Sequence, residues 1–270
     1  MKSLCSLLLA ATLAAPLVPL VPAAAQVDTI RPSHSLFTWR DGVLAAGFAV
    51  ATVAIRPLDK AAANVLQNPY RQKNRVFKTA ATIVRDVAQP GSYVIGASMF
   101  AAGKATHSER LAEVGLHGTE ALAIGALFAD GLKYTFGRAR PFVDTVPNPD
   151  NWQLFRGTKG GNYQSFPSGH TTAAFAAAAA VSAETSRWYP ELTYFLIGPV
   201  MYGGATAVGL SRMYNNRHWA SDVIMGAAIG TFAGTKVVRY HRTHPGNKVD
   251  KSLLNIGWSP GHGLTLGVVR

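Results

Sequence analysis

Apolar residues gather in separate stretches along this chain, with polar or charged connectors between them. The stretches are Gly42–Ile55, Tyr93–Ala102, Ala121–Ala129, Thr171–Val181, Leu192–Leu210 and Val223–Val237. They are rich in Ala and Leu and contain few alternating runs of the kind that a half-buried strand produces. The pattern therefore predicts helices and favours an all-α bundle over a sheet.

Whether these helices cross a bilayer depends on their length, because a spanning helix needs about 20 predominantly apolar residues. Gly42–Ile55 is too short, the stretch near Ala121 carries Glu120 and Asp130, and only Leu192–Leu210 approaches that length. The mean hydropathy of +0.12 is modest for a polytopic membrane protein. We favour a soluble or peripheral bundle and keep an integral membrane protein as the alternative.

The N-terminus has the layout of a secretory signal. Residues 1–25 contain Lys2, an apolar run and the small-residue site Ala23-Ala24-Ala25, which predicts cleavage before Gln26 and export to the periplasm. A retained membrane anchor is the alternative, although prolines interrupt the apolar run. Cys5 is the only cysteine, so the mature chain would have no thiol for a disulfide or a cysteine metal site.

The remaining residues divide into one large region and a tail. Residues 26–245 are predicted to form the helical domain. Within it, Phe142–Phe166 is rich in Pro, Asn, Asp and Gly and predicts a long loop, whose aromatic residues suit a lid or a substrate wall. In residues 246–270, two alternating runs flank Pro260-Gly261-His262-Gly263, which predicts a short β-hairpin.

The chain is strongly basic, with 26 Lys and Arg against 14 Asp and Glu and a formal charge of +12. Such a balance favours anionic partners: nucleic acid, phosphorylated metabolites or anionic lipid head groups. Charge alone does not choose among them. The basic run Tyr70–Lys78 is interpreted as a solvated helix face, with contact to an anionic membrane surface as the alternative.

An anion site is predicted where Ser168-Gly169-His170 precedes an alanine-rich helix. Gly169 permits a close approach of the backbone, and the first N–H groups of the helix point their positive dipole end toward whatever lies there. Helix N-termini of this kind bind phosphate and other anions.

Two further groups of polar residues suit the same chemistry. Lys133 and Arg140 are seven apart, so they would share a helix face and could clamp phosphate oxygens if the helix continues through Gly137. Arg138 lies on another face and is interpreted as structural or solvated.

Downstream lie Arg212, His218 and Asp222. His218 and Asp222 are four apart, so the carboxylate could accept the imidazole Nδ1–H and leave Nε2 free to act as a nucleophile or base.

Together these residues form three motifs in order, without internal gaps: Lys133-x6-Arg140-Pro141, Pro167-Ser168-Gly169-His170 and Ser211-Arg212-x5-His218-x3-Asp222. They resemble the tripartite signature of the PAP2 superfamily, which comprises type 2 phosphatidic acid phosphatases, bacterial class A acid phosphatases and vanadium-dependent haloperoxidases. The resemblance covers about Leu132 to Val223. It implies an all-α bundle of the PAP2 and haloperoxidase type.

The resemblance also implies roles for these residues. His218 would attack phosphorus and form a phosphohistidine, Asp222 would hold its tautomer, and His170 would protonate the leaving oxygen. The phosphate oxygens would be held by Lys133, Arg140, Ser168, Gly169 and Arg212. The implied activity is a metal-independent phosphatase acting on phosphomonoesters or lipid phosphates, with no cofactor.

Other functions remain as alternatives. A vanadate-dependent haloperoxidase would use the same residues, and a non-catalytic anion-binding envelope protein would keep them without turnover. The predicted export signal argues against a nucleic-acid binder. No convincing group of metal ligands is found: His241 and His244, near the end of a basic helix, are interpreted as surface residues that suit the helix dipole, with a metal site as the alternative.

Overall fold

The computed structural model describes residues 35–254, 256–259 and 263–266, so the predicted signal segment 1–25 and Cys5 lie outside the described residues. The described elements are α2 (Trp39–Ile55), α3 (Pro57–Leu66), α4 (Pro69–Gln72), α5 (Arg75–Asp86), α6 (Ser92–Ala105), α7 (Glu109–Phe136), α8 (Gly169–Thr185), α9 (Pro190–Leu192), α10 (Gly198–Tyr214), α11 (Ala220–Thr243), α12 (Lys248–Leu253), β1 (Ile256–Ser259) and β2 (Gly263–Leu266). The predicted all-α fold is confirmed.

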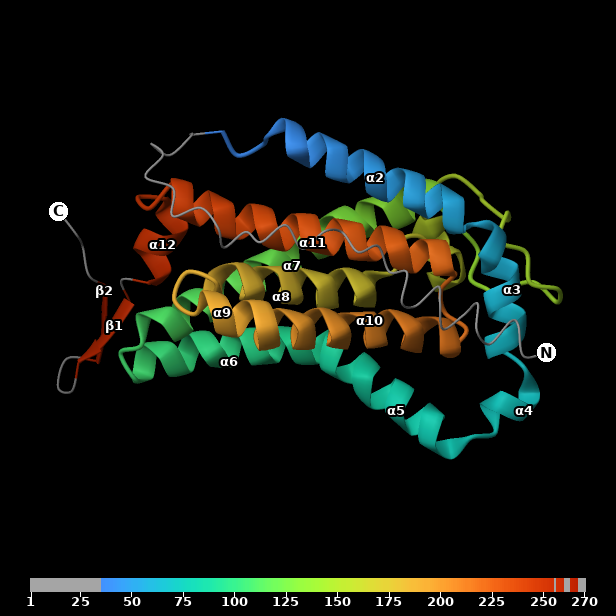
Figure 1. Cartoon of the computed structure of the whole chain (residues 1–270), viewed down its shortest axis with the longest axis horizontal. Coiled ribbons are helices and arrows are strands. Elements are labelled where there is room, and N and C mark those ends of the chain that lie inside the picture. Colours follow the sequence, from blue (N-terminus) through green and yellow to red (C-terminus); the bar gives the residue numbers. More distant parts are fainter. Residues whose placement is uncertain (1–34, 255, 260–262, 267–270) are drawn as a thin grey trace. The chain divides into compact units, whose positions relative to one another are not determined.

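Helix α8 is the centre of the bundle. Helices α7, α10 and α11 pack directly against it, while α6 lies on α7, α2 on α11 and α5 on α10 (Figure 1). The alanine run of α8 explains this position, because small side chains let three helices approach one axis, and most of these alanines are buried.

Helix α11 approaches α8 through glycines spaced four apart. A Cβ on Gly226 would lie 2.6 Å from the carbonyl oxygen of Ser168, and Cβ atoms on Gly230 and Gly234 would overlap the backbone of α8 one and two turns further along. Only glycine permits this close backbone contact, which fixes the start of α11 against the start of α8.

Several boundaries differ from those expected. The stretch Ala121–Ala129 is the middle of the 28-residue helix α7. Leu192–Leu210 lies within one continuous helical segment, Pro190–Tyr214, in which the π-helical turn Thr193–Ile197 joins α9 to α10. The basic run Tyr70–Lys78 is not one helix face, because it covers the end of α4 and the start of α5.

Two described segments are long and apolar enough to cross a membrane, Glu109–Phe136 and Pro190–Tyr214. Trp39–Ile55 and Pro57–Leu66, which meet at 60°, would add a third if they form one broken span. The expectation that only Leu192–Leu210 approaches a spanning length is therefore wrong, because α7 reaches it despite Glu120 and Asp130.

The predicted C-terminal hairpin is confirmed. Strands β1 and β2 pair antiparallel, with Ile256 opposite Leu266 and Ser259 opposite Gly263.

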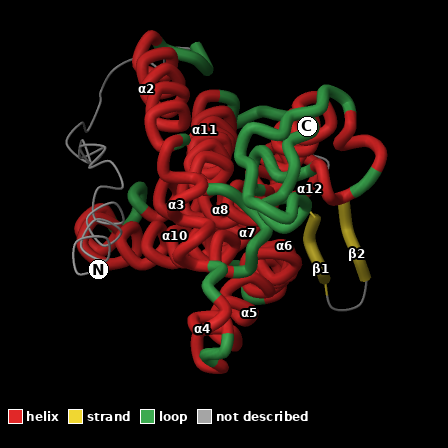
Figure 2. Tube along the Cα trace, turned by 90° about the vertical axis from the view of Figure 1, so that its right-hand side faces the viewer, coloured by secondary structure: helices red, strands yellow, loops and turns green. Residues whose placement is uncertain are grey.

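The loops and helix ends that carry the three motifs lie at one end of the bundle. Helices α8 and α11 begin there, and α7 and α10 end there (Figure 1). The loop between α7 and α8 lies across these helix ends, as Figure 2 shows from that side. Residues from all three motifs are therefore delivered to one place.

Candidate active site

The three motifs meet at this end of the bundle. An added Cβ on Gly169, the first residue of α8, would lie 2.7 Å from the Lys133 ammonium nitrogen. The Ser168 N–H donates to the Asp222 carbonyl at 3.0 Å. Arg140 places a guanidinium nitrogen 3.5 Å from Nε2 of His218. Residues separated by up to about ninety positions thus share one site.

His218 is buried and held in one orientation. It lies in the connection before α11, and its Nδ1 is 2.7 Å from the backbone carbonyl of Ser165. Because a carbonyl can only accept a hydrogen bond, the ring proton must be on Nδ1 and the lone pair on Nε2. Burial, together with the positive charge of Arg140, lowers the pKa of His218 to about 4. The imidazole is therefore neutral near pH 7, with Nε2 turned toward Arg140.

The expected direct hydrogen bond between Asp222 and His218 is absent. Asp222 Oδ2 lies 3.8 Å from Nδ1, beyond hydrogen-bond distance. His218 precedes helix α11, which begins at Ala220, so the two residues do not stack as neighbours on one helix turn. Oδ2 instead accepts the Ser165 hydroxyl at 2.5 Å and the Trp219 N–H at 2.8 Å. Asp222 therefore reaches His218 through Ser165.

Arg138 is fully buried and joins two carboxylates. Its Nη1 donates to Asp222 Oδ1 at 2.5 Å and its Nη2 to Asp59 Oδ2 at 2.7 Å. Asp59, from α3, also accepts the Ser221 N–H at 2.8 Å. Although burial alone would lower it, the two carboxylates hold the pKa of Arg138 above its usual range. The interpretation of Arg138 as structural holds, but it is not solvated.

Arg140 reaches the site from a loop. Helix α7 ends at Phe136 and Gly137 adopts a left-handed conformation with φ of 55°, so Lys133 and Arg140 do not share a helix face. Arg140 is held by the carbonyls of Gly161, at 2.6 Å, and Arg217, at 3.1 Å. Burial and the charge of Arg217 lower the pKa of Arg140 to about 10, so it stays charged at neutral pH.

The remaining predicted phosphate-binding residues line the same place. Lys133 pairs with Asp130 at 2.7 Å while its ammonium lies over Gly169. Ser168 is fully buried at the start of α8, and its hydroxyl oxygen accepts from Thr171 at 2.8 Å. Arg212 is buried near the end of α10, and its Nε has no hydrogen-bond partner among the described residues.

His170 lies in the first turn of α8 and faces a positive environment. Burial, then the charges of Arg212, His218, Lys133 and Arg85, lower its pKa to about 3. Its protonated form is disfavoured in the absence of an anion. An arriving phosphate dianion would raise the pKa of His170, because it offsets the cations that disfavour the imidazolium.

The loop expected as a lid is held by an aromatic cluster. Trp152 packs edge-to-face against Phe166 and Phe136, with ring centroids 5.3 and 6.1 Å apart. The Arg138 guanidinium lies 4.6 Å from the Trp152 ring centroid. Arg156 packs over Tyr163 at 5.2 Å. The loop is therefore anchored to the same buried network that holds Asp222.

Sequence reasoning missed four residues that shape the site, Asp59, Arg85, Ser165 and Arg217, and it did not predict that Arg138 is buried. Arg217 is adjacent to His218 and could have been noticed. Asp59 and Arg85 are more than 80 positions from the third motif and carry no motif of their own.

The comparisons with known proteins concern the family and the fold of this chain. A family model of the PAP2 superfamily matches residues 116–245. A lipid A 1-phosphatase from Porphyromonas gingivalis is 38% identical over 119 residues, which cover 42% of this chain but only 21% of that protein. The chain thus spans about a fifth of that relative.

Two solved structures are similar. A transmembrane PAP2-type phosphatidylglycerolphosphate phosphatase from Bacillus subtilis aligns with a TM-score of 0.55 and 19% identity, covering 76% of this chain and 97% of that one. LpxE from Aquifex aeolicus aligns with a TM-score of 0.49 and 18% identity, over 68% of this chain and 96% of that one. The first supports the helical fold. The family match and the three motifs show that residues 116–245 of this chain are a PAP2 superfamily domain.

Proposed function

We propose that this protein is a membrane-embedded phosphatase that hydrolyses a lipid phosphate through a phosphohistidine on His218, without a metal at the reaction centre. The observation that carries the proposal is the meeting of a neutral, oriented His218 with His170 and the cations Lys133, Arg140 and Arg212 at one end of the bundle. In the part of the chain that the structure describes, Lys133 pairs with Asp130, whereas Arg140 and Arg212 form no ion pair with a carboxylate, which suits a dianionic phosphate.

In the first step, Nε2 of His218 would attack phosphorus. The N–P bond forms as the ester P–O bond breaks, and His170 gives its proton to the leaving oxygen. Because the developing charge spreads over the phosphoryl oxygens, fixed cations and the backbone N–H of Gly169 stabilise the transition state more than the ground state. The ring proton stays on Nδ1, where the Ser165 carbonyl holds it.

In the second step, water would attack the phosphohistidine. His170, neutral after losing its proton, takes a proton from that water, and the N–P bond breaks to return His218 to its starting form. Phosphate then leaves. Asp222 and Ser165 stabilise the positive charge that develops on His218 during both steps.

The surface of the described helices favours a lipid substrate. Leu127 on α7 is 74% exposed and Phe195 before α10 is 75% exposed, and both lie on segments long enough to span a bilayer. Apolar side chains on α2 and α6 are exposed as well. Large exposed apolar surfaces mark contact with membrane or protein. We therefore replace the soluble or peripheral bundle favoured from sequence with an integral membrane protein; export to the periplasm stays a prediction.

The test is phosphate release by the full chain in detergent micelles, with phosphatidic acid, phosphatidylglycerol phosphate, lipid A and para-nitrophenyl phosphate as substrates. Initial rates are measured with EDTA present. We expect release from at least one lipid phosphate, abolished in His218→Ala and retained in the control His244→Ala, whose ring bonds to its own helix backbone. Equal rates for wild type and His218→Ala would contradict the proposal.

The two alternatives give different outcomes. A haloperoxidase would oxidise halide with peroxide once vanadate is added, whereas a phosphatase is inhibited by vanadate as a mimic of the five-coordinate state. A non-catalytic envelope protein would bind inorganic phosphate but would not hydrolyse any of the substrates.

A further inference from the structure

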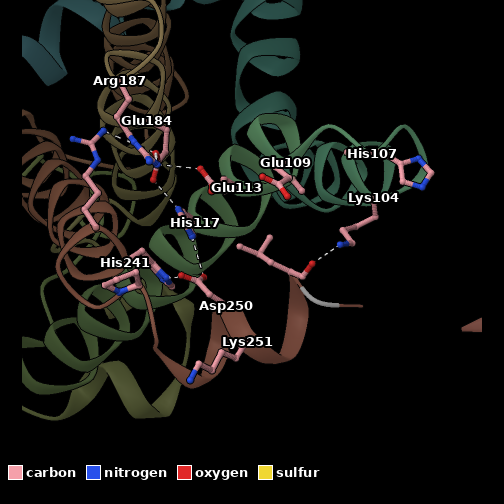
Figure 3. A pocket seen from close by; sticks show the side chains of 15 residues that line it. Lys104, His107, Glu109, Glu113, His117, Glu184, Arg187, His241, Asp250 and Lys251 are labelled. Atoms are coloured by element: carbon pink, nitrogen blue, oxygen red, sulfur yellow. Dashed lines mark hydrogen bonds and ion pairs between the residues drawn. The ribbon is translucent and has the colours of Figure 1, made fainter. Parts of the chain in front are cut away.

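A second cluster of titratable side chains lies at the end of the bundle opposite His218. His117 comes from α7, Glu184 from the last turns of α8, His241 from α11 and Asp250 from α12 (Figure 3). His170 and Glu184 are separated by fourteen residues of α8, which corresponds to roughly 21 Å. The cluster therefore takes no part in the phosphate site. It also overturns the interpretation of His241 as a surface residue, since His241 is only 5% exposed.

Each of the two histidines is held between carboxylates. His117 contacts Glu184 through Nδ1 at 2.7 Å and Asp250 Oδ1 through Nε2 at 3.2 Å. His241 contacts Glu120 through Nε2 at 2.6 Å and the same Asp250 oxygen through Nδ1 at 2.8 Å. The two outer carboxylates fix the rings, and both inner nitrogens converge on one oxygen of Asp250.

The number of protons makes this arrangement unusual. Four imidazole–carboxylate contacts need four N–H hydrogens, but two neutral imidazoles supply only two. Filling all four would make both rings imidazolium cations. These rings are stacked, with centroids 3.9 Å apart and planes 18° apart, so two like charges would face each other in a buried place. A single cation between the inner atoms removes that conflict, because each histidine would then donate one N–H to its outer glutamate and offer the lone pair of its inner nitrogen to the cation.

We propose that His117 Nε2, His241 Nδ1 and Asp250 Oδ1 bind one divalent metal ion of the zinc class. These atoms all lie within 4.8 Å of one another. A tetrahedral zinc ion about 2.1 Å from each ligand keeps its ligands roughly 3.4 Å apart, close to the separations of 2.8 and 3.2 Å from Asp250. The two rings are stacked in this structure, so they would have to turn apart to bring both lone pairs onto the ion.

The surroundings match those of a metal centre. A ligand histidine in such centres typically donates its other N–H to a carboxylate, and Glu184 and Glu120 occupy those positions. Two imidazoles and one carboxylate suit zinc better than magnesium or calcium, which prefer oxygen ligands. A cavity of about 440 Å³, lined also by Lys104 and Glu113, borders the three ligands and leaves room for water at the fourth position.

The ion would join the C-terminal segment to the bundle. Asp250 lies in the six-residue helix α12, while the histidines lie on α7 and α11, so one ion connects three elements. A short helix has little stability of its own, and metal binding adds directly to the stability of the state that contains the site. The inference is independent of the proposed phosphatase activity.

The test uses the full chain without an affinity tag, dialysed free of metal and titrated with Zn²⁺ or Co²⁺ alone. We expect one ion per chain, a visible absorption band on Co²⁺ binding that reports four-coordinate ligation, and a Zn²⁺-dependent rise in Tm. Asp250→Asn and His241→Gln should weaken binding by at least about a hundredfold, and Glu120→Gln by about 10–100-fold.

His244→Gln is the matched control, because His244 is at the end of the same helix but bonds to its own backbone. It should bind metal as the wild type does. Helical circular dichroism and phosphate release from a lipid substrate report folding in every variant. The proposal is overturned if the folded wild type takes up no stoichiometric metal, or if Asp250→Asn binds as tightly as the wild type. Loss of metal with phosphate release intact would leave the proposed function untouched.

Discussion

Ser165 connects His218 to Asp222: its carbonyl accepts from the imidazole Nδ1 at 2.7 Å, and its hydroxyl donates to the Asp222 carboxylate at 2.5 Å. The Asp222 carboxylate thus acts on His218 indirectly, through Ser165. The backbone carbonyl of Ser165 fixes the tautomer of His218, and the Asp222 carboxylate holds Ser165 in position through its hydroxyl.

Ser165→Ala should therefore be a mild change. It removes the hydroxyl but keeps the carbonyl, so we expect kcat to fall by about 10-fold with KM unchanged, as is typical when a group that orients a reacting residue is lost. Asp222→Asn, which also weakens the ion pair with Arg138, should lower kcat further. Steady-state kinetics on the best lipid substrate measures both, and an effect of Ser165→Ala as large as that of His218→Ala would show that the hydroxyl itself is needed.

Arg138→Gln should destabilise the whole fold. The change leaves the buried carboxylates of Asp59 and Asp222 without their shared cation, which typically costs about 3–5 kcal/mol. Arg138→Lys should recover only part of the loss, because one ammonium cannot bridge both carboxylates as the planar guanidinium does. Thermal denaturation in detergent is the measurement. The control is Arg156→Gln, a loop arginine over Tyr163, and a similar loss of Tm in that control would refute the assignment.

Phosphate binding should take up a proton at His170. The pKa of this imidazole is lowered to about 3 by burial and nearby cations, and a bound dianion would raise it toward the ordinary value. A group whose pKa rises on binding gains a proton, so phosphate affinity should increase as pH falls toward the pKa of the complex. Calorimetry of inorganic phosphate binding in two buffers of different ionisation enthalpy measures the uptake.

His170→Gln provides the correction for the ionisation of phosphate itself. The difference between wild type and His170→Gln should be a positive proton uptake. No difference between the two proteins would mean that His170 does not change its charge when the anion binds.

Gly230→Ala should weaken the contact between α8 and α11. A Cβ at this position would overlap the Thr172 carbonyl, so one helix must shift, at a cost of about 1–3 kcal/mol. Gly203→Ala on α10 meets nothing within 4 Å, and we expect it to be neutral or stabilising, since alanine is the better helix former. Comparison of Tm for the two variants tests the packing; equal values would show that the close approach is not required.

Much of this molecule could be predicted from local patterns. The apolar stretches gave the helices of the bundle, the alternating runs around Pro260 gave the C-terminal hairpin, and the motif residues named the PAP2 superfamily. These succeed because helix periodicity, turn chemistry and motif spacing depend on residues close in sequence. The spacing of His218 and Asp222 also predicted that the two belong together, although not how.

What the sequence alone could not decide is which groups become partners. A spacing of four suggested a direct His218–Asp222 bond, but His218 precedes α11 and Ser165, more than fifty positions earlier, takes the place between them. The sequence around Arg138 does not indicate a partner for it, and the fold brings Asp59, on α3, into contact with its guanidinium. His117 and His241 are 124 positions apart and meet only because α7 and α11 pack on the same helix. Two side chains can share a hydrogen bond or a metal ion only if they lie close in space. That distance depends on how the helices pack, which local sequence patterns do not show.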